Sequence, residues 1–180
     1  MPARNFPSIE LVRQALRYEN GKLFWKERPV SHFKSEKACK RFNTYYPDTE
    51  ACSLNFSRGE CRYRTHLFGL NLYRQTIVWA LHHGVWCIGL DHKNRNTLDD
   101  RISNLRIATR IQNGYNSGIY KNNTSGYKGV SWHKSKKMYG ATITVDRKQI
   151  HLGYFATSVK AYAAYVKAAK KYHGKFFCSG

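Results

Sequence analysis

The chain has 180 residues, enough for one moderate domain or two small ones. Its 31 Lys and Arg residues against 11 Asp and Glu residues give a formal net charge of +20. A surface this basic favours a polyanionic partner, above all nucleic acid. It argues against a protein that binds cationic partners through an acidic surface.

Several classes of protein are disfavoured by what the sequence lacks. It has no run of about 18 apolar residues, so we expect no transmembrane helix and no membrane partner. The opening MPARNFPSIE has no apolar signal core, which leads us to expect a cytoplasmic protein. Five cysteines without a C-x-x-C pair argue against a disulfide framework and a thiolate zinc site. No feature indicates an obligate protein partner.

The N-terminal part, residues 1–75, is predicted to combine helix and strand and to support the central part of the chain. Ser8 is placed to cap a short helix, and an Asn-Gly turn signal then separates two strand-like runs. Two further strands are expected around Gly69. Residues 29–60 carry no pattern that assigns them to an element.

The central part predicts two strands followed by a helix. Residues 75–84 have the apolar side of a helix, and the apolar run after them reaches a strand end at Asp91 and His92. A loop rich in Asn and Asp leads to a second short strand, NLRIAT. Thr109 then caps a helix that carries Asn113. The order is that of a ββα unit.

The polar residues of this unit suit the hydrolysis of a phosphodiester. Such a reaction needs a divalent cation to neutralise developing charge and a base to take a proton from water. Asp91 and Asn113 offer the oxygen donors that Mg²⁺ or Mn²⁺ prefers. His92 is the natural base near neutral pH.

The stretch GLDHKNRNTLDDRISNLRIATRIQN resembles the HNH nuclease motif of phage and intron-encoded homing endonucleases. The resemblance implies an HNH ββα-metal nuclease over residues 76–117, with His92 as general base. It implies that the side chain of Asn104 pins the loop between the strands. Asp91 and Asn113 would hold one divalent ion, Mg²⁺ or Mn²⁺, and no zinc site is expected.

The resemblance also implies an activity and a partner: a metal-dependent endonuclease, homing-type or nicking, that acts on double-stranded DNA in the host cytoplasm if a phage encodes it. Arg101 and Arg106 either contact the DNA or brace the loop. Adjacent residues of a regular strand face opposite ways. We therefore expect an irregular strand end at Asp91 and His92, so that both face one ion.

The C-terminal part changes character after a linker at residues 118–127. Residues 118–180 hold twelve Lys or Arg and one acidic residue, Asp146. Residues 128–180 predict three antiparallel strands with alternating apolar and polar residues, then a helix over 158–172 that covers the apolar face. On this alternation Trp132 is expected in the core.

Residues 128–180 are similar to the Apetala/ethylene-response-factor DNA-binding domain, through KGV, HLGYFAT and the Ala-rich helix ending HGKFF. Most of the positions that contact DNA in that family are Arg or Trp there and are smaller or neutral here. We therefore expect phosphate contacts to supply most of the affinity. The matching positions are Lys128, Ser131, His133, Tyr139, Thr142, Thr144 and His151.

As a whole the sequence predicts an α+β protein: a central ββα-metal (HNH) nuclease module plus a C-terminal three-stranded antiparallel sheet packed on one helix. The leading hypothesis is a DNA endonuclease. One alternative is a DNA-binding regulator with an inactive nuclease module, against which the intact motif residues argue. Another is an RNA-binding or structural basic protein, which leaves the motif spacing unexplained.

Overall fold

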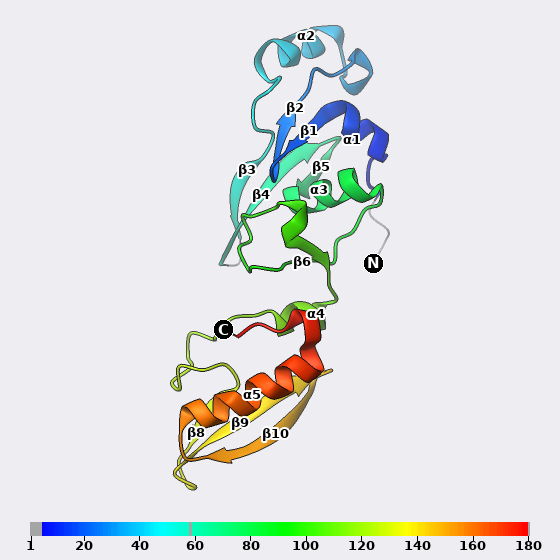
Figure 1. Cartoon of the computed structure of the whole chain (residues 1–180). Helices are drawn as coiled ribbons and strands as arrows, with labels where there is room; N and C mark the ends of the chain where they lie inside the picture. The colour runs from blue at the N-terminus through cyan, green and yellow to red at the C-terminus, as the bar shows by residue number, and fades with distance from the viewer. Residues whose placement is uncertain (1–4, 58, 180) are drawn as a thin grey trace. The chain divides into compact units, whose positions relative to one another are not determined.

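The computed structural model describes residues 5–57 and 59–179 (Figure 1). The chain divides into two compact units, residues 1–107 and residues 108–180, called here the N-terminal and C-terminal units. Both contain helices and small antiparallel sheets, so the chain is of the α+β class. Among the described residues, no helix combines the length and apolar character that spanning a membrane requires.

The N-terminal unit opens with a helix and a hairpin. Helix α1 (Ile9–Ala15) begins where the Ser8 side chain accepts a backbone hydrogen bond, as a serine cap does. Strands β1 (Leu16–Glu19) and β2 (Lys22–Trp25) pair antiparallel through the Asn-Gly turn. The predicted helix and hairpin are confirmed.

The segment without a sequence pattern folds around an arginine. It contains the short helix η1 (Val30–His32), helix α2 (Glu36–Tyr45) and strand β3 (Ser53–Ser57). The Arg28 guanidinium lies within 5.5 Å of the centres of four aromatic rings. These rings belong to Trp25, Phe33, Phe42 and Phe68. Cation–π contacts thus help to hold this segment together.

A three-stranded sheet, β3-β4-β5, forms the centre of the unit (Figure 1). Strands β4 (Glu60–Leu67) and β5 (Leu70–Tyr73) confirm the two strands expected around Gly69. One face buries Leu67 and Leu72 in the core. Helix α3 (Arg74–His83) follows β5 without a loop and packs its apolar residues into the same core, as predicted.

The unit ends in a small ladder of two strands, β6 (Leu90–His92) and β7 (Leu105–Ile107), with the short helix η2 (Ile102–Asn104) before β7. The apolar run expected as one strand is strand only at its end. Val85 and Ile88 within it are exposed. Their hydrophobicity gave a strand signal, although residues 85–89 have no ladder partner.

The C-terminal unit contains the helix of the predicted ββα order and continues into a sheet that is covered by one helix (Figure 1). The sheet order is β10-β9-β8, all antiparallel, and the three predicted strands and the long helix are confirmed. The elements are α4 (Arg110–Tyr115), β8 (Val130–His133), β9 (Met138–Val145), β10 (Lys148–Phe155), α5 (Ser158–His173) and η3 (Gly174–Phe176). The expected limits at residues 75, 117 and 127 stay predictions.

The core position expected for Trp132 is wrong, because its side chain is 45% exposed. The core under α5 is made by small residues, Val130, Ala141 and Ala161 among them. Trp132 lies on the outer strand β8, one residue pair from the β8–β9 turn, and contacts only the edge of the Tyr139 ring among the described aromatic residues. Strand alternation therefore predicted the face of the sheet on which Trp132 lies, but not how far its side chain is buried.

Candidate active site

Strand β6 places Asp91 and His92 in a regular ladder. Asp91 pairs with Arg106 and His92 with Leu105, in unbroken register. The irregular strand end that we expected is therefore not found in this ladder. The two side chains follow strand alternation: the Asp91 carboxylate accepts from Arg106, and the His92 ring contacts Asp100.

The imidazole of His92 is held by a buried carboxylate. His92 is 4% exposed, and its Nε2 lies 2.8 Å from Oδ1 of Asp100, which is 2% exposed. An ionised carboxylate only accepts hydrogen bonds, so Nε2 is the donor. In the neutral ring the basic lone pair is then on Nδ1. An imidazole whose orientation is fixed by an acid in this way can act chemically as a general base.

Arg74, the first residue of α3, neutralises that carboxylate. Its Nε donates to Oδ2 of Asp100 at 2.7 Å, and the residue is 3% exposed. The same guanidinium bonds Glu50 at 3.0 Å and the carbonyl of Leu98 at 2.9 Å, and lies 3.6 Å from the centre of the Tyr63 ring. The buried Asp100 carboxylate thus has a buried guanidinium at one oxygen and the His92 imidazole at the other.

Asn104 ties together the loop between β6 and β7. Its Nδ2 donates to the side chain of Asn94 at 2.9 Å and to the carbonyl of Asp99 at 2.7 Å. Its Oδ1 accepts the backbone N–H of Asn94 at 3.0 Å. These three hydrogen bonds join the two ends of the loop to Asn104.

Both arginines of the motif pair with carboxylates. Arg101 donates twice to Asp99, at 2.7 Å each, and this contact lowers the pKa of Asp99 to about 2. Arg106 donates through Nε and a terminal nitrogen to Oδ2 of Asp91, at 2.8 and 2.7 Å. These bonds support the bracing interpretation of the two residues.

The donor chemistry fits one hard cation better than a metal cluster. Asp91 is buried and supplies a carboxylate, and Mg²⁺ in proteins is commonly held by one or two carboxylates while it keeps several waters. Over residues 5–57 and 59–179, no group of three or more His, Cys, Asp or Glu residues could hold a metal. The remaining protein donor expected from the motif is the amide of Asn113.

Asn113 lies on α4, which is part of the C-terminal unit. The Tyr115 ring stacks on His173, with centroids 3.8 Å apart and planes 9° apart. The Tyr115 hydroxyl donates to Asp146 at 3.2 Å, and Lys128 Nζ donates to the Tyr115 carbonyl at 2.8 Å. The helix that presents Asn113 is therefore fastened to the C-terminal sheet and helix. The spacing of the motif did not show this.

The outer face of the C-terminal sheet carries most of the positions expected to contact DNA. Ser131, Thr144 and His151 are exposed, and His133 and Thr142 are half-buried. Lys128 differs from them, because its amine donates to the backbone carbonyls of Tyr115 and Ser117.

Tyr139 belongs to the other face. It pairs with Phe155 and packs on the core cluster under α5, so its expected place beside the polar positions is wrong. On β9 it lies two residues from the buried Ala141, and residues two apart share a face.

Tyr154 takes a place on the outer face that the sequence interpretation missed. A register shift between His151 and Gly153 moves it onto the side of His151, and the two rings lie 4.4 Å apart. Its ring also contacts His133, and Lys136 Nζ lies 3.9 Å from its centre. The signal was available, since a glycine inside a strand, here Gly153 with φ 126°, often marks a bulge.

Comparisons with known proteins show which family and which relative this chain is similar to. Residues 72–115 match the HNH endonuclease family. Over 105 residues the chain is 34% identical to Protein 3.8 of Escherichia phage T7, an alignment that covers 57% of this chain and 86% of that protein. No solved structure matches. The family match spans the end of β5, α3, the β6–β7 ladder and α4, which are the elements that carry Arg74, Asp91, His92 and Asn113.

Proposed function

This chain belongs to the HNH endonuclease family, and on that premise we propose that it is a metal-dependent endonuclease, homing-type or nicking, that hydrolyses phosphodiester bonds in double-stranded DNA. The observation that carries the proposal is the buried chain of contacts from Arg74 through Asp100 to His92. A surface hairpin that is only rich in asparagine would not require a buried imidazole held in one orientation by a buried carboxylate. A decayed site would not need to keep it either.

In this proposal His92 is the general base. Its Nδ1 takes the proton of the attacking water, and the ring becomes an imidazolium. The positive charge then lies beside the Asp100 carboxylate, 2.8 Å away, which stabilises it. Arg74 fixes the position of that carboxylate, and Asn104 holds the loop that carries it. The roles of Arg74, Asp100 and Asn104 are therefore positional.

Asp91 and Asn113 are the proposed ligands of one Mg²⁺ or Mn²⁺. When bound, such an ion neutralises charge on the phosphate and on the leaving oxygen. Arg106 fixes the carboxylate of Asp91 through two hydrogen bonds to one oxygen. Capping by Thr109 starts the helix that presents Asn113.

The C-terminal unit is the proposed DNA-binding part, of the Apetala/ethylene-response-factor type. Support comes from the three-stranded sheet covered by one helix on one face and from the strong excess of lysine and arginine over acid. Its open face offers hydroxyl and imidazole groups where that family has arginine. Affinity then comes mainly from phosphate contacts, which predicts a steep decrease of binding with salt.

The test is incubation of the purified chain with supercoiled plasmid and phage DNA in the presence of Mg²⁺ or Mn²⁺. We expect nicked or linear product, abolished by EDTA, and mapped ends show whether one strand or both are cut. Tight DNA binding with no cleavage under any of these conditions would contradict the proposal and would favour the DNA-binding regulator.

A further inference from the structure

The sheet β3-β4-β5 of the N-terminal unit has a second face that the proposed chemistry does not use. Register and alternation divide its residues, because Asn55 pairs with Arg62, Arg64 with Tyr73, and His66 with Asn71. These residues share the face opposite to the buried Leu67 and Leu72. The unused face is therefore polar from one end of the sheet to the other. We call it the outer face of this sheet.

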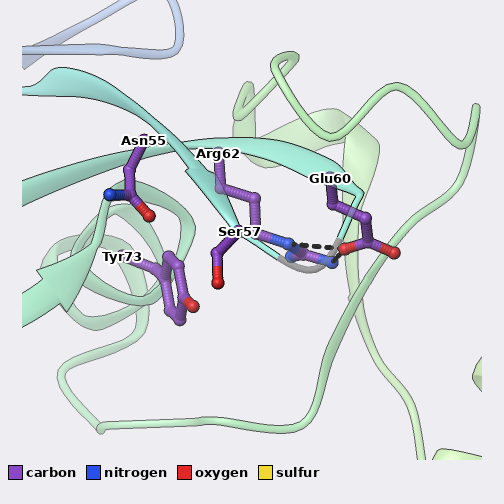
Figure 2. Close-up of a pocket in the computed structure, with 5 residues that line it drawn as sticks. All are labelled: Asn55, Ser57, Glu60, Arg62 and Tyr73. Carbon is purple, nitrogen blue, oxygen red and sulfur yellow. Dashed lines mark hydrogen bonds and ion pairs between the residues drawn. The ribbon is translucent and has the colours of Figure 1, made fainter.

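Two hollows lie side by side on the outer face. The first, a cavity of about 360 Å³, is lined by Asn55, Ser57, Glu60, Arg62 and Tyr73. Figure 2 shows the Arg62 side chain directed to Glu60, with Asn55 and Tyr73 on the other side of Ser57. The second, of about 510 Å³, is lined in part by Arg64 and shares Asn55 with the first. Both are open depressions in the protein surface and not closed cavities in the core.

The hydrogen-bonding groups here are mixed rather than uniformly basic. Arg62 is held by Glu60 at 2.8 Å and by Gln75 at 2.7 Å, so its guanidinium has a fixed direction. Arg64 lies over the Tyr73 ring at 4.8 Å, and its buried Nε has no hydrogen-bond partner in the described structure. Phosphate oxygens only accept hydrogen bonds, whereas base edges offer both donors and acceptors. Guanidinium, amide, hydroxyl and carboxylate together supply the donors and acceptors that read base edges.

The outer face is also fixed relative to the candidate base His92, since both belong to the N-terminal unit. Tyr73 directly precedes Arg74, which holds Asp100 and through it His92. The hydroxyl of Thr97, in the loop after His92, donates to the carbonyl of Cys61 on β4 at 2.7 Å. A base pair bound on this sheet would therefore have a set distance to the imidazole.

From these observations we propose that the outer face of β3-β4-β5 contacts base edges in the major groove of duplex DNA and thereby selects the bond that is cut. A short antiparallel sheet fits that groove, as β-sheet readers show. The inference rests on the proposed endonuclease function. It divides the work between the units: the C-terminal unit supplies affinity through phosphates, and the N-terminal sheet supplies selectivity.

The test is a double variant, Asn55→Ala with Asn71→Ala, compared with wild type by mapping cleavage ends on a mixed-sequence DNA library. Each lost base contact should lower the preference for the wild-type site over others by roughly tenfold. The dependence of binding on salt should not change, because base contacts release no counterions. The matched control is Leu54→Ala, an exposed side chain on the other face of β3, which should keep the wild-type pattern.

A second variant guards against a folding defect. Tyr73→Phe keeps the ring under Arg64 and removes only the hydroxyl, and it should shift site preference in the same direction by a smaller factor. If both variants cut the wild-type sites with unchanged preference, the inference is wrong and the endonuclease proposal stands. If the wild-type chain cuts no DNA, the endonuclease proposal is wrong, and the inference fails with it.

Discussion

Asp100 is the residue on which the proposed site depends most, and replacing it gives the sharpest structural prediction. Its carboxylate is the shared acceptor of two buried groups, at 2.7 Å from Arg74 Nε and 2.8 Å from His92 Nε2. Asp100→Ala leaves the imidazole without this acceptor and leaves the guanidinium with Glu50 as its remaining charged partner. Breaking a buried pair in this way costs about 3–5 kcal/mol, and the contact with Glu50 favours the lower end.

Asp100→Asn keeps the shape and part of the bonding, so a smaller loss of about 1–3 kcal/mol is expected. The assay is urea unfolding of the full chain followed by tryptophan fluorescence, with cleavage rates measured on the same preparations. Asp48→Ala is the control, because that carboxylate is largely exposed although it also pairs with an arginine, and it should change little. If Asp100→Ala is as stable as the control, the buried chain of contacts does not hold His92.

Three further results are expected. Asn104→Ala removes three hydrogen bonds of the loop and should lower both the unfolding free energy, by about 1–3 kcal/mol in urea, and the cleavage rate. Truncation after Ser117 removes Lys128, Asp146 and His173, which contact Tyr115 of α4. Plasmid nicking should therefore decrease, although every motif residue remains. Equal nicking would show that α4 is positioned without these contacts. Burial lowers the pKa of His173, so its contribution to the unfolding free energy should be complete above about pH 6.5, should fall as pH decreases from there toward the lowered pKa, and should level off below it; His173→Gln should remove this contribution.

Much of the fold was predictable because short-range signals specify it. The Ser8 cap, the Asn-Gly turn and the alternating residues of the C-terminal strands act over a few residues, and the structure has each of them. The order of strand, loop, strand and helix in the motif was predictable for the same reason, and Thr109 begins its helix with a capping box as its side chain allows.

What the sequence could not show depends on partners far apart in the chain. The helical spacing of Cys39 and Phe42 in α2 was open to detection, but the packing of Phe42 against Arg28 is a tertiary contact that this spacing does not show. The support of His92 requires Arg74 and Asp100 to meet across 26 positions of sequence, and nothing local marks Asp100 rather than its neighbour Asp99 as the acceptor. The fastening of α4 to the C-terminal unit is likewise a tertiary contact.

The most direct test of the whole account compares wild type with His92→Ala in a single-turnover cleavage assay with Mg²⁺ or Mn²⁺, alongside DNA binding measured in EDTA. The account predicts that cleavage falls by roughly 10²–10⁴-fold while DNA affinity stays unchanged, since the imidazole moves a proton and does not hold the duplex. Cleavage at the wild-type rate, or a matching loss of binding and cleavage, would contradict the assignment of His92 as the base.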